Sequence, residues 1–167
     1  MATGRGNHLT KQIGEYLVAA ELGRRGFIAA TFSGNVPDYD IVATDAQFRS
    51  ILIQVKAING SSWQLDIRRF VNVALDGNKQ VLGAQVVAPR KVICIMVVIS
   101  QYGSDRFYIL EWRTLQDILV RGYQAYLTLK NGVRPKKFDS YHIAINETQL
   151  ASHKDDWTLL NEAVNGA

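Results

Sequence analysis

Two neighbouring apolar segments of the sequence contain polar side chains of types that can perform chemistry. VPDYDIVATD contains Asp38 and Asp40, and the following ILIQVKA contains Gln54 and Lys56. Carboxylate and carbonyl oxygens are ligands suited to Mg²⁺, and a lysine beside them can stabilise negative charge on a substrate. Because burying an unpaired charge is costly, we expect Lys56 to have an acidic neighbour.

Both segments predict β-strands, which the short polar turn DAQFR joins into an antiparallel hairpin. Side chains alternate between the two faces of a strand, so Gln54 and Lys56 share one face. A hairpin centred near Gln47 places Asp40 directly opposite Gln54, with Lys56 on the diagonal. The three polar side chains therefore converge, and the lysine gains an acid as its neighbour.

The segment HLTKQIGEYLVAAELGRRGF predicts a helix that brings a further acid to this place. Its main apolar face has the helical period and consists of Leu9, Ile13, Tyr16, Leu17 and Ala20. Glu15 lies away from that face, on a second stripe with Val18, Ala19 and Leu22. We expect packing on both sides, with Glu15 facing a cleft and Gly14 allowing another backbone to approach closely.

The remaining segments predict the frame that positions these residues. KVICIMVVIS is typical of a buried central strand, RFYILEW predicts another strand, and SSWQLDIRRFVNVAL fits a strand or a helix. TLQDILVRGYQAYLTLKNG predicts a helix with Thr114 as N-cap and Asn131-Gly132 as its end. SYHIAI predicts a late strand, and ETQLASHKDDWTLLNEAV predicts a terminal helix. This order indicates an α/β sandwich with a mixed central sheet flanked by helices, in a single domain over residues 1–167.

An ordered set of residues on the helix and the two hairpin strands resembles the PD-(D/E)xK nuclease superfamily in its QxK variant: Glu15, Pro37-Asp38-x-Asp40 and Gln54-x-Lys56. GEYLVAAELGRRGF, PDYDIVA and ILIQVKA are most similar to Holliday-junction-resolvase-like and intron-endonuclease-like members. The resemblance covers roughly residues 9–57, where the core motifs of the domain lie. It implies a restriction-endonuclease-like fold and a metal-dependent endonuclease that hydrolyses phosphodiester bonds in structured or foreign DNA.

The resemblance also implies roles for the residues, with Mg²⁺ or Mn²⁺ as the cofactor. Phosphodiester hydrolysis adds negative charge at phosphorus, so the enzyme supplies cations and an activated water. Asp40 is the expected principal metal ligand, Glu15 is a ligand or the water-holding base, and Gln54 offers its amide oxygen from the usual acidic position. Lys56 would orient or deprotonate the water. A lysine among carboxylates should stay protonated, which favours an electrostatic role.

Several other residues are candidates for an auxiliary role or for contact with DNA. Asp38 can add negative charge at the mouth of the site, and Ser33 can touch a phosphate, although both also suit an ordinary turn or loop. The candidate phosphate contacts are paired cations: Arg24-Arg25, Arg68-Arg69, Arg90-Lys91 and Lys136-Lys137. Each pair taken alone is more typical of a solvated surface, and the net charge of +4 permits an anionic partner without requiring one.

Composition excludes several other classes of protein. No apolar run approaches the ~20 residues of a membrane span, and the polar N-terminus contains no signal-peptide core. Cys94 is the only cysteine, so an intrachain disulfide is impossible, which agrees with a cytoplasmic location. The sequence contains no phosphate-binding glycine loop and no metal-ligand spacing of histidines. The expected partners are DNA and, since cutting both strands usually needs two sites, a second copy of the chain.

Two other functions compete with the endonuclease. One is a non-catalytic DNA-binding module with the same fold, which the intact Glu15, Asp40 and Lys56 disfavour. The other is an RNA-directed nuclease, for which the sequence contains no aromatic-rich RNA-binding surface.

Overall fold

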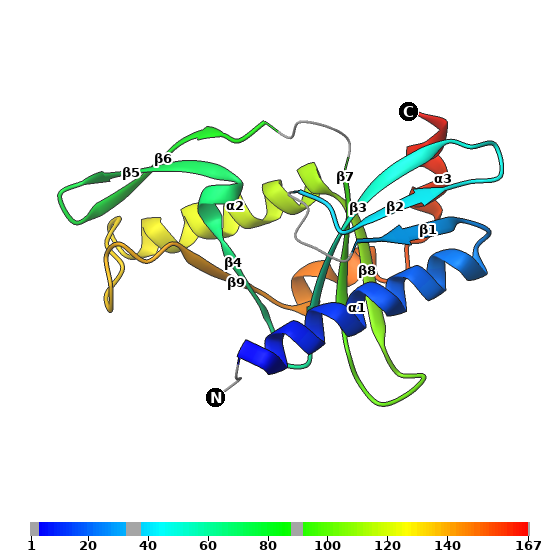
Figure 1. Cartoon of the computed structure of the whole chain (residues 1–167). Helices are drawn as coiled ribbons and strands as arrows, with labels where there is room; N and C mark the ends of the chain where they lie inside the picture. Colours follow the sequence, from blue (N-terminus) through cyan, green and yellow to red (C-terminus); the bar gives the residue numbers. More distant parts are fainter. Residues whose placement is uncertain (1–3, 33–37, 88–91, 167) are drawn as a thin grey trace.

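The computed structural model describes residues 4–32, 38–87 and 92–166, and a five-stranded mixed sheet lies at its centre (Figure 1). The strand order across this sheet is β1 (Ile28–Thr31), β2 (Ile41–Thr44), β3 (Ser50–Ile58), β7 (Val92–Val98) and β8 (Arg106–Glu111). Strands β3 and β7 are parallel, and the other neighbouring pairs are antiparallel.

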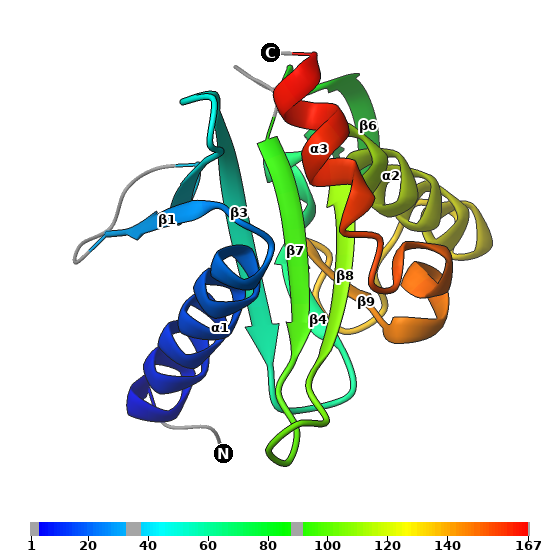
Figure 2. The ribbon, with the colours of Figure 1, turned by 90° about the vertical axis from the view of Figure 1, so that its right-hand side faces the viewer.

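Helices cover both faces of the sheet: α1 (Gly4–Arg24), α2 (Trp112–Leu129) and α3 (Thr158–Asn165). Side chains of α1 and α3 pack on one face, which is turned to the viewer in Figure 2, and side chains of α2 pack on the other. This arrangement confirms the predicted fold class, a sandwich with a mixed central sheet flanked by helices. That the whole chain forms one domain stays a prediction.

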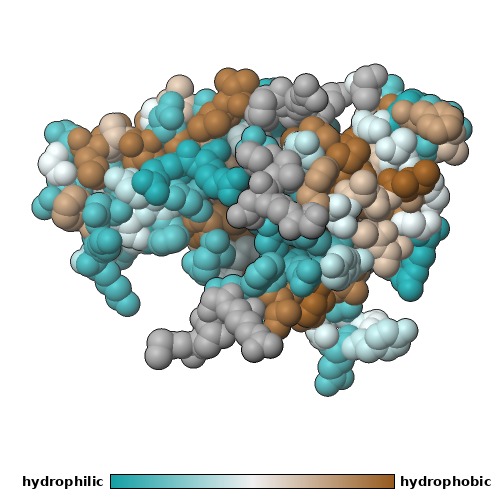
Figure 3. Space-filling view, in the orientation of Figure 1, coloured by the Kyte–Doolittle hydropathy of each residue, from teal (hydrophilic) through white to brown (hydrophobic). Residues whose placement is uncertain are grey.

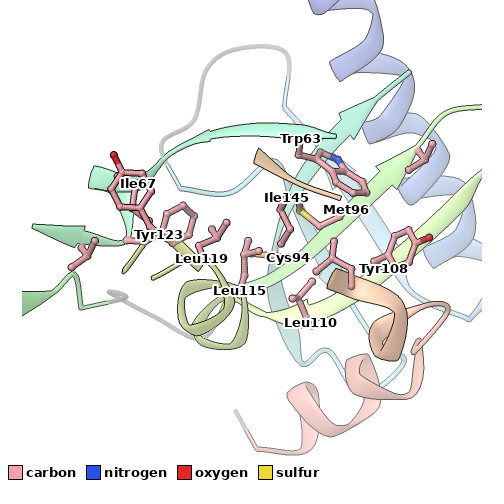
Figure 4. Close-up of a cluster of buried hydrophobic side chains, with 14 of the residues drawn as sticks. Trp63, Ile67, Cys94, Met96, Tyr108, Leu110, Leu115, Leu119, Tyr123 and Ile145 are labelled. Atoms are coloured by element: carbon pink, nitrogen blue, oxygen red, sulfur yellow. The ribbon is translucent and has the colours of Figure 1, made fainter. Parts of the chain in front are cut away.

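Strand β7 is buried along its whole length, as its continuous apolar sequence predicts. Ile93 and Ile95 join the core beneath α1 and α3, while Cys94 and Met96 join the core beneath α2. Figure 4 shows the second core, where Leu115 of α2 lies beside Cys94. A strand with both faces covered needs apolar residues at every position, because neither face meets water.

Two smaller sheets lie outside the central one: β4 (Trp63–Asp66) with β9 (His142–Ile145), and β5 (Val71–Asp76) with β6 (Lys79–Gln85). The segment that fitted either a strand or a helix therefore forms β4, a 3₁₀ turn over Ile67–Arg69 and then β5. Strands β5 and β6 form an arm beside α2, away from the central sheet (Figure 1). Gln116 of α2 is 3% exposed, and its amide donates hydrogen bonds to the carbonyls of Phe70 and Val86 at the base of the arm, just before β5 and just after β6.

Two predicted helix boundaries are wrong. Helix α2 begins at Trp112 rather than after Thr114, because Trp112 stacks on Phe70 with ring centroids 5.3 Å apart. The predicted terminal helix is interrupted: a 3₁₀ segment (Glu147–His153) is followed by extended backbone before α3 begins. The N–H of Asp155 donates to the carbonyl of Phe107 at 2.9 Å, so pairing with β8 replaces helical hydrogen bonds there.

The predicted main apolar face of α1 is at the surface. Leu9, Ile13 and Tyr16 are 50%, 44% and 57% exposed, whereas Val18 and Leu22 of the second stripe are fully buried. Figure 3 shows apolar surface over this part of the molecule. The smaller face packs on the sheet because it contains Gly14, where an added Cβ would lie 2.3 Å from the Cβ of Ala57 on β3. The predicted close approach at Gly14 is thus confirmed, and the predicted packing of the larger face is wrong.

Glu147 joins the 3₁₀ segment to β8, and Glu147→Gln is expected to destabilise the fold by about 1 kcal/mol at pH 7. Its carboxylate accepts hydrogen bonds from Arg106 at 2.6 Å and from Tyr108 at 2.5 Å, which lower the pKa of Glu147 to about 2. The ordinary value is 4.5, so this contribution is present above pH 4.5 and is lost as the pH falls through about 2. Denaturation at several pH values checks this. A difference between wild type and variant that persists unchanged at pH 2 would contradict the assignment.

Candidate active site

The hairpin of β2 and β3 places Asp40 beside β3. The observed register pairs Ile41 with Ile53, and continuing it by one residue sets Asp40 opposite Gln54, as predicted. The Asp40 N–H donates to the carbonyl of Ile53 at 2.8 Å, and its Oδ2 accepts a hydrogen bond from the N–H of Val55 at 2.8 Å. One carboxylate oxygen is thus held by the backbone of β3, and Oδ1 is left for another partner.

That partner is Lys11, a residue that sequence reasoning missed. Its Nζ lies 3.3 Å from Asp40 Oδ1 and 3.5 Å from Glu15 Oε1, so one ammonium bridges acids from the hairpin and from α1. The two carboxylate side chains are each 12% exposed, whereas that of Lys11 is 48% exposed. The available signal was the i,i+4 spacing of Lys11 and Glu15 on the helix. The predicted proximity of Glu15 and Asp40 is observed through this shared cation.

The pKa values of Glu15 and Lys11 are shifted by partial burial and by the charges around them. Burial raises the pKa of Glu15, repulsion from Asp40 raises it further, and the Lys11 ammonium opposes both. Burial works to lower the pKa of Lys11, but attraction and hydrogen bonds from the two acids outweigh it, so the pKa rises. Lys11 is therefore held as a cation between two anions, and the place between the carboxylates is one that favours positive charge.

Lys56 interacts electrostatically with Asp40 and Lys11. Burial lowers the pKa of Lys56 and outweighs the attraction of Asp40, while Arg69 and Lys11 lower it further. Burial, rather than the carboxylate, has the larger effect on the pKa of this lysine. That Lys56 stays protonated remains a prediction. The backbone carbonyl of Lys56 accepts a hydrogen bond from the indole of the buried Trp63 at 2.8 Å, which ties β3 to the first residue of β4.

A pocket of about 200 Å³ adjoins this group, between the start of α1, the end of β3 and β4. Lys11 and Lys56 both line it, together with Trp63 and Gln64. Two lysine residues thus line one open volume beside the acid pair.

Gln54 and Asp38 meet at the other side of Asp40. Gln54 is 6% exposed, and its amide nitrogen lies 3.4 Å from the backbone carbonyl of Asp38, which leaves the amide oxygen for another partner. Asp38 is exposed and has a φ of 74°, and it contacts Gln54 through its backbone carbonyl. Ser33 and Pro37 lie outside the described residues.

The oxygen atoms that could hold a divalent metal ion come from Asp40, Glu15 and Gln54. In the part of the chain that the structure describes, no group of three or more His, Cys, Asp or Glu side chains could hold a metal. Mg²⁺ keeps several water ligands and is commonly bound by one or two carboxylates, so this smaller set fits its chemistry. The bridging ammonium of Lys11 marks a position where the oxygens of Asp40 and Glu15 already hold a cation.

The predicted arginine pairs differ in their environments. Arg24 and Arg25 both bind Glu21, and Arg68 binds Asp66, so these guanidinium groups already have acidic partners. Arg69 is exposed, and within the described residues it makes no hydrogen bond or ion pair, yet it lies close enough to lower the pKa of Lys56. Arg69 is therefore the candidate with a free charge beside the site.

Arg90 and Lys91 lie outside the described residues. None of the helices in the described ranges is long and apolar enough to cross a membrane.

A solved structure shares this fold. The chain is similar to the structure of a bacterial homing endonuclease, I-Ssp6803I, with 14% sequence identity and a TM-score of 0.56, over 95% of each chain. At this identity the similarity shows the fold alone. No family model matches the sequence, and no curated protein matches it significantly. Membership of the PD-(D/E)xK superfamily stays a prediction.

Proposed function

From a fold shared with a homing endonuclease and two acids that share one cation, we propose that this protein is a metal-dependent DNA endonuclease. It would hydrolyse phosphodiester bonds in structured or foreign DNA, with Mg²⁺ or Mn²⁺ as cofactor. The observation that carries the proposal is the bridging of Glu15 and Asp40 by a cation next to Lys56 and an open pocket. This combination would supply metal ligands and positive charge at one place.

In the proposed mechanism, Asp40 and the Gln54 amide oxygen would hold the metal ion, and Glu15 would be either a further ligand or the base that holds the attacking water. The bound ion supplies Lewis-acid stabilisation of the phosphoryl oxygens and an acidified water. The backbone of β3 orients Asp40 through the Val55 N–H, which keeps the carboxylate in one rotamer. Lys56 places its ammonium against the negative charge that develops on phosphorus, and Glu15 accepts or orients the proton of the attacking water.

Burial of Lys56 lowers its pKa, and the same desolvation would strengthen the interaction of its ammonium with a developing anion. Cleavage of both DNA strands would need two such sites, so we also propose that two copies of the chain act together.

The proposal is tested by incubating the purified protein with supercoiled plasmid, branched DNA and single-stranded DNA. We expect nicked or linear products with Mg²⁺ or Mn²⁺ and intact DNA with EDTA. Binding without cleavage under every metal condition would instead support a non-catalytic DNA-binding module. Cleavage of RNA with all DNA forms left intact would support an RNA-directed nuclease.

Arg69→Ala is expected to weaken DNA binding several-fold and to reduce the slope of log K against log salt by ~0.9, because one phosphate contact is lost. Arg24→Ala is the matched control, since it removes the same charge from a residue paired with Glu21, which keeps Arg25 as a partner. Fluorescence anisotropy over a salt series measures both. Equal losses in the two variants would show that Arg69 contributes only general positive charge.

A further inference from the structure

The position of Lys11 raises a question about how the acid pair takes up a metal ion. Its ammonium lies 3.3 Å from Asp40 and 3.5 Å from Glu15, on the same oxygens that the proposed metal ion would need. Both carboxylate side chains are only 12% exposed, so bulk water cannot fully screen their repulsion. A cation at this place stabilises the pair when no metal is bound.

Lys11 is also suited to leaving that place. Its side chain is 48% exposed and ends a flexible four-carbon stem, so its two ion pairs can exchange at small cost. It lines the pocket of about 200 Å³ that Lys56 also lines, so the released ammonium has an adjoining volume to enter. The helix itself stays in position through the buried contact between Gly14 and Ala57.

We propose that Lys11 is a resident counter-cation of the Asp40–Glu15 pair, which a divalent metal ion displaces into the pocket beside Lys56. The biological use of this exchange rests on the proposed function. The exchange itself can be tested by metal binding alone, without DNA cleavage. An ammonium and a dication repel each other across the same two oxygens, so they compete. The protein therefore binds the metal ion more weakly than the two carboxylates would without Lys11.

The test is titration of the full-length protein with Mn²⁺ alone, without DNA, followed by calorimetry. Lys11→Met keeps the length of the stem and removes the charge, and it is expected to bind Mn²⁺ about tenfold more tightly, as a neighbouring charge typically changes the proton affinity of a carboxylate. Lys11→Arg keeps the charge and is expected to bind like the wild type. Lys11→Gln provides a second neutral variant should the methionine variant fold poorly.

Thermal unfolding supplies a second measurement. Without metal, Lys11→Met should melt at a lower temperature than the wild type, and saturating Mn²⁺ should raise its melting temperature by more. Adding Asp40→Asn should abolish the gain in affinity, which locates the effect at this pair. Unchanged or weaker Mn²⁺ binding by both neutral variants would overturn the inference, because Lys11 would then organise the ligands rather than compete.

The outcomes separate this inference from the proposed function. Tighter Mn²⁺ binding by the neutral variants, with no DNA cleavage by any form of the protein, supports the counter-cation and contradicts the endonuclease. Absence of Mn²⁺ binding in both wild type and variants overturns the counter-cation and the metal dependence of the proposed reaction together.

Discussion

Asp40→Asn is expected to abolish metal-dependent DNA cleavage, by about 10³-fold or more, while DNA binding is retained. The substitution removes the charge that would anchor the metal ion and that now pairs with Lys11. It keeps the size of the side chain, and the amide oxygen can still accept the hydrogen bond from Val55. Binding is expected to stay equal or to tighten, since repulsion between the carboxylate and phosphate is removed.

Asp38→Asn is the matched control for this experiment. It makes the same chemical change two residues away, on an exposed side chain in a loop where asparagine also tolerates the positive φ of 74°. We expect less than a tenfold loss of cleavage from the control. Plasmid nicking rates and anisotropy measurements give both quantities. Equal cleavage by the wild type and Asp40→Asn would assign the activity to another site or to a contaminant.

Gly14→Ala is expected to lower both the stability of the fold and the rate of cleavage. An added Cβ would lie 2.3 Å from the Cβ of Ala57, so α1 must move away from β3. Overpacking of this kind costs about 1–3 kcal/mol. Because α1 also carries Lys11 and Glu15, its displacement separates them from Asp40, and cleavage should fall along with stability.

Gly23→Ala supplies the opposite control on the same helix. No atom lies within 4 Å of a Cβ added at Gly23 apart from its own helix and chain neighbours, so this change should stabilise the fold by about 0.5–1 kcal/mol. Denaturant unfolding and cleavage rates should be measured for both variants. A Gly14→Ala variant as stable as Gly23→Ala would show that α1 does not pack so closely on β3.

The local sequence pattern predicted those parts of the fold that depend on residues close together in the sequence. The hairpin register follows from the length of one turn, so the placement of Asp40 opposite Gln54 could be worked out from strand alternation. The burial of β7 follows from its unbroken apolar sequence, because such a strand has no face that suits water. The end of α2 also agreed, with Asn131 and Gly132 both at positive φ.

Longer-range contacts decided what the pattern could not. The two stripes of α1 were both apolar, and the choice between them depended on fit: the Gly14 side approaches β3 closely, whereas Leu9 and Tyr16 stay exposed. The start of α2 was set by Trp112 stacking on Phe70 from a distant segment. In both places the deciding partner lies far away in the sequence, so helical period alone could not identify it.

The sequence by itself determined which chemistry was available: two acids, an amide and a lysine, placed by strand alternation on the hairpin and by helical period on α1. Only the tertiary structure decided how those charges are balanced. Docking of α1 on β3 brings Lys11 between Glu15 and Asp40, and the burial of Lys56 outweighs the attraction of its acidic neighbour. Charge balance depends on distance and desolvation, which exist only after the chain has folded and water has been excluded.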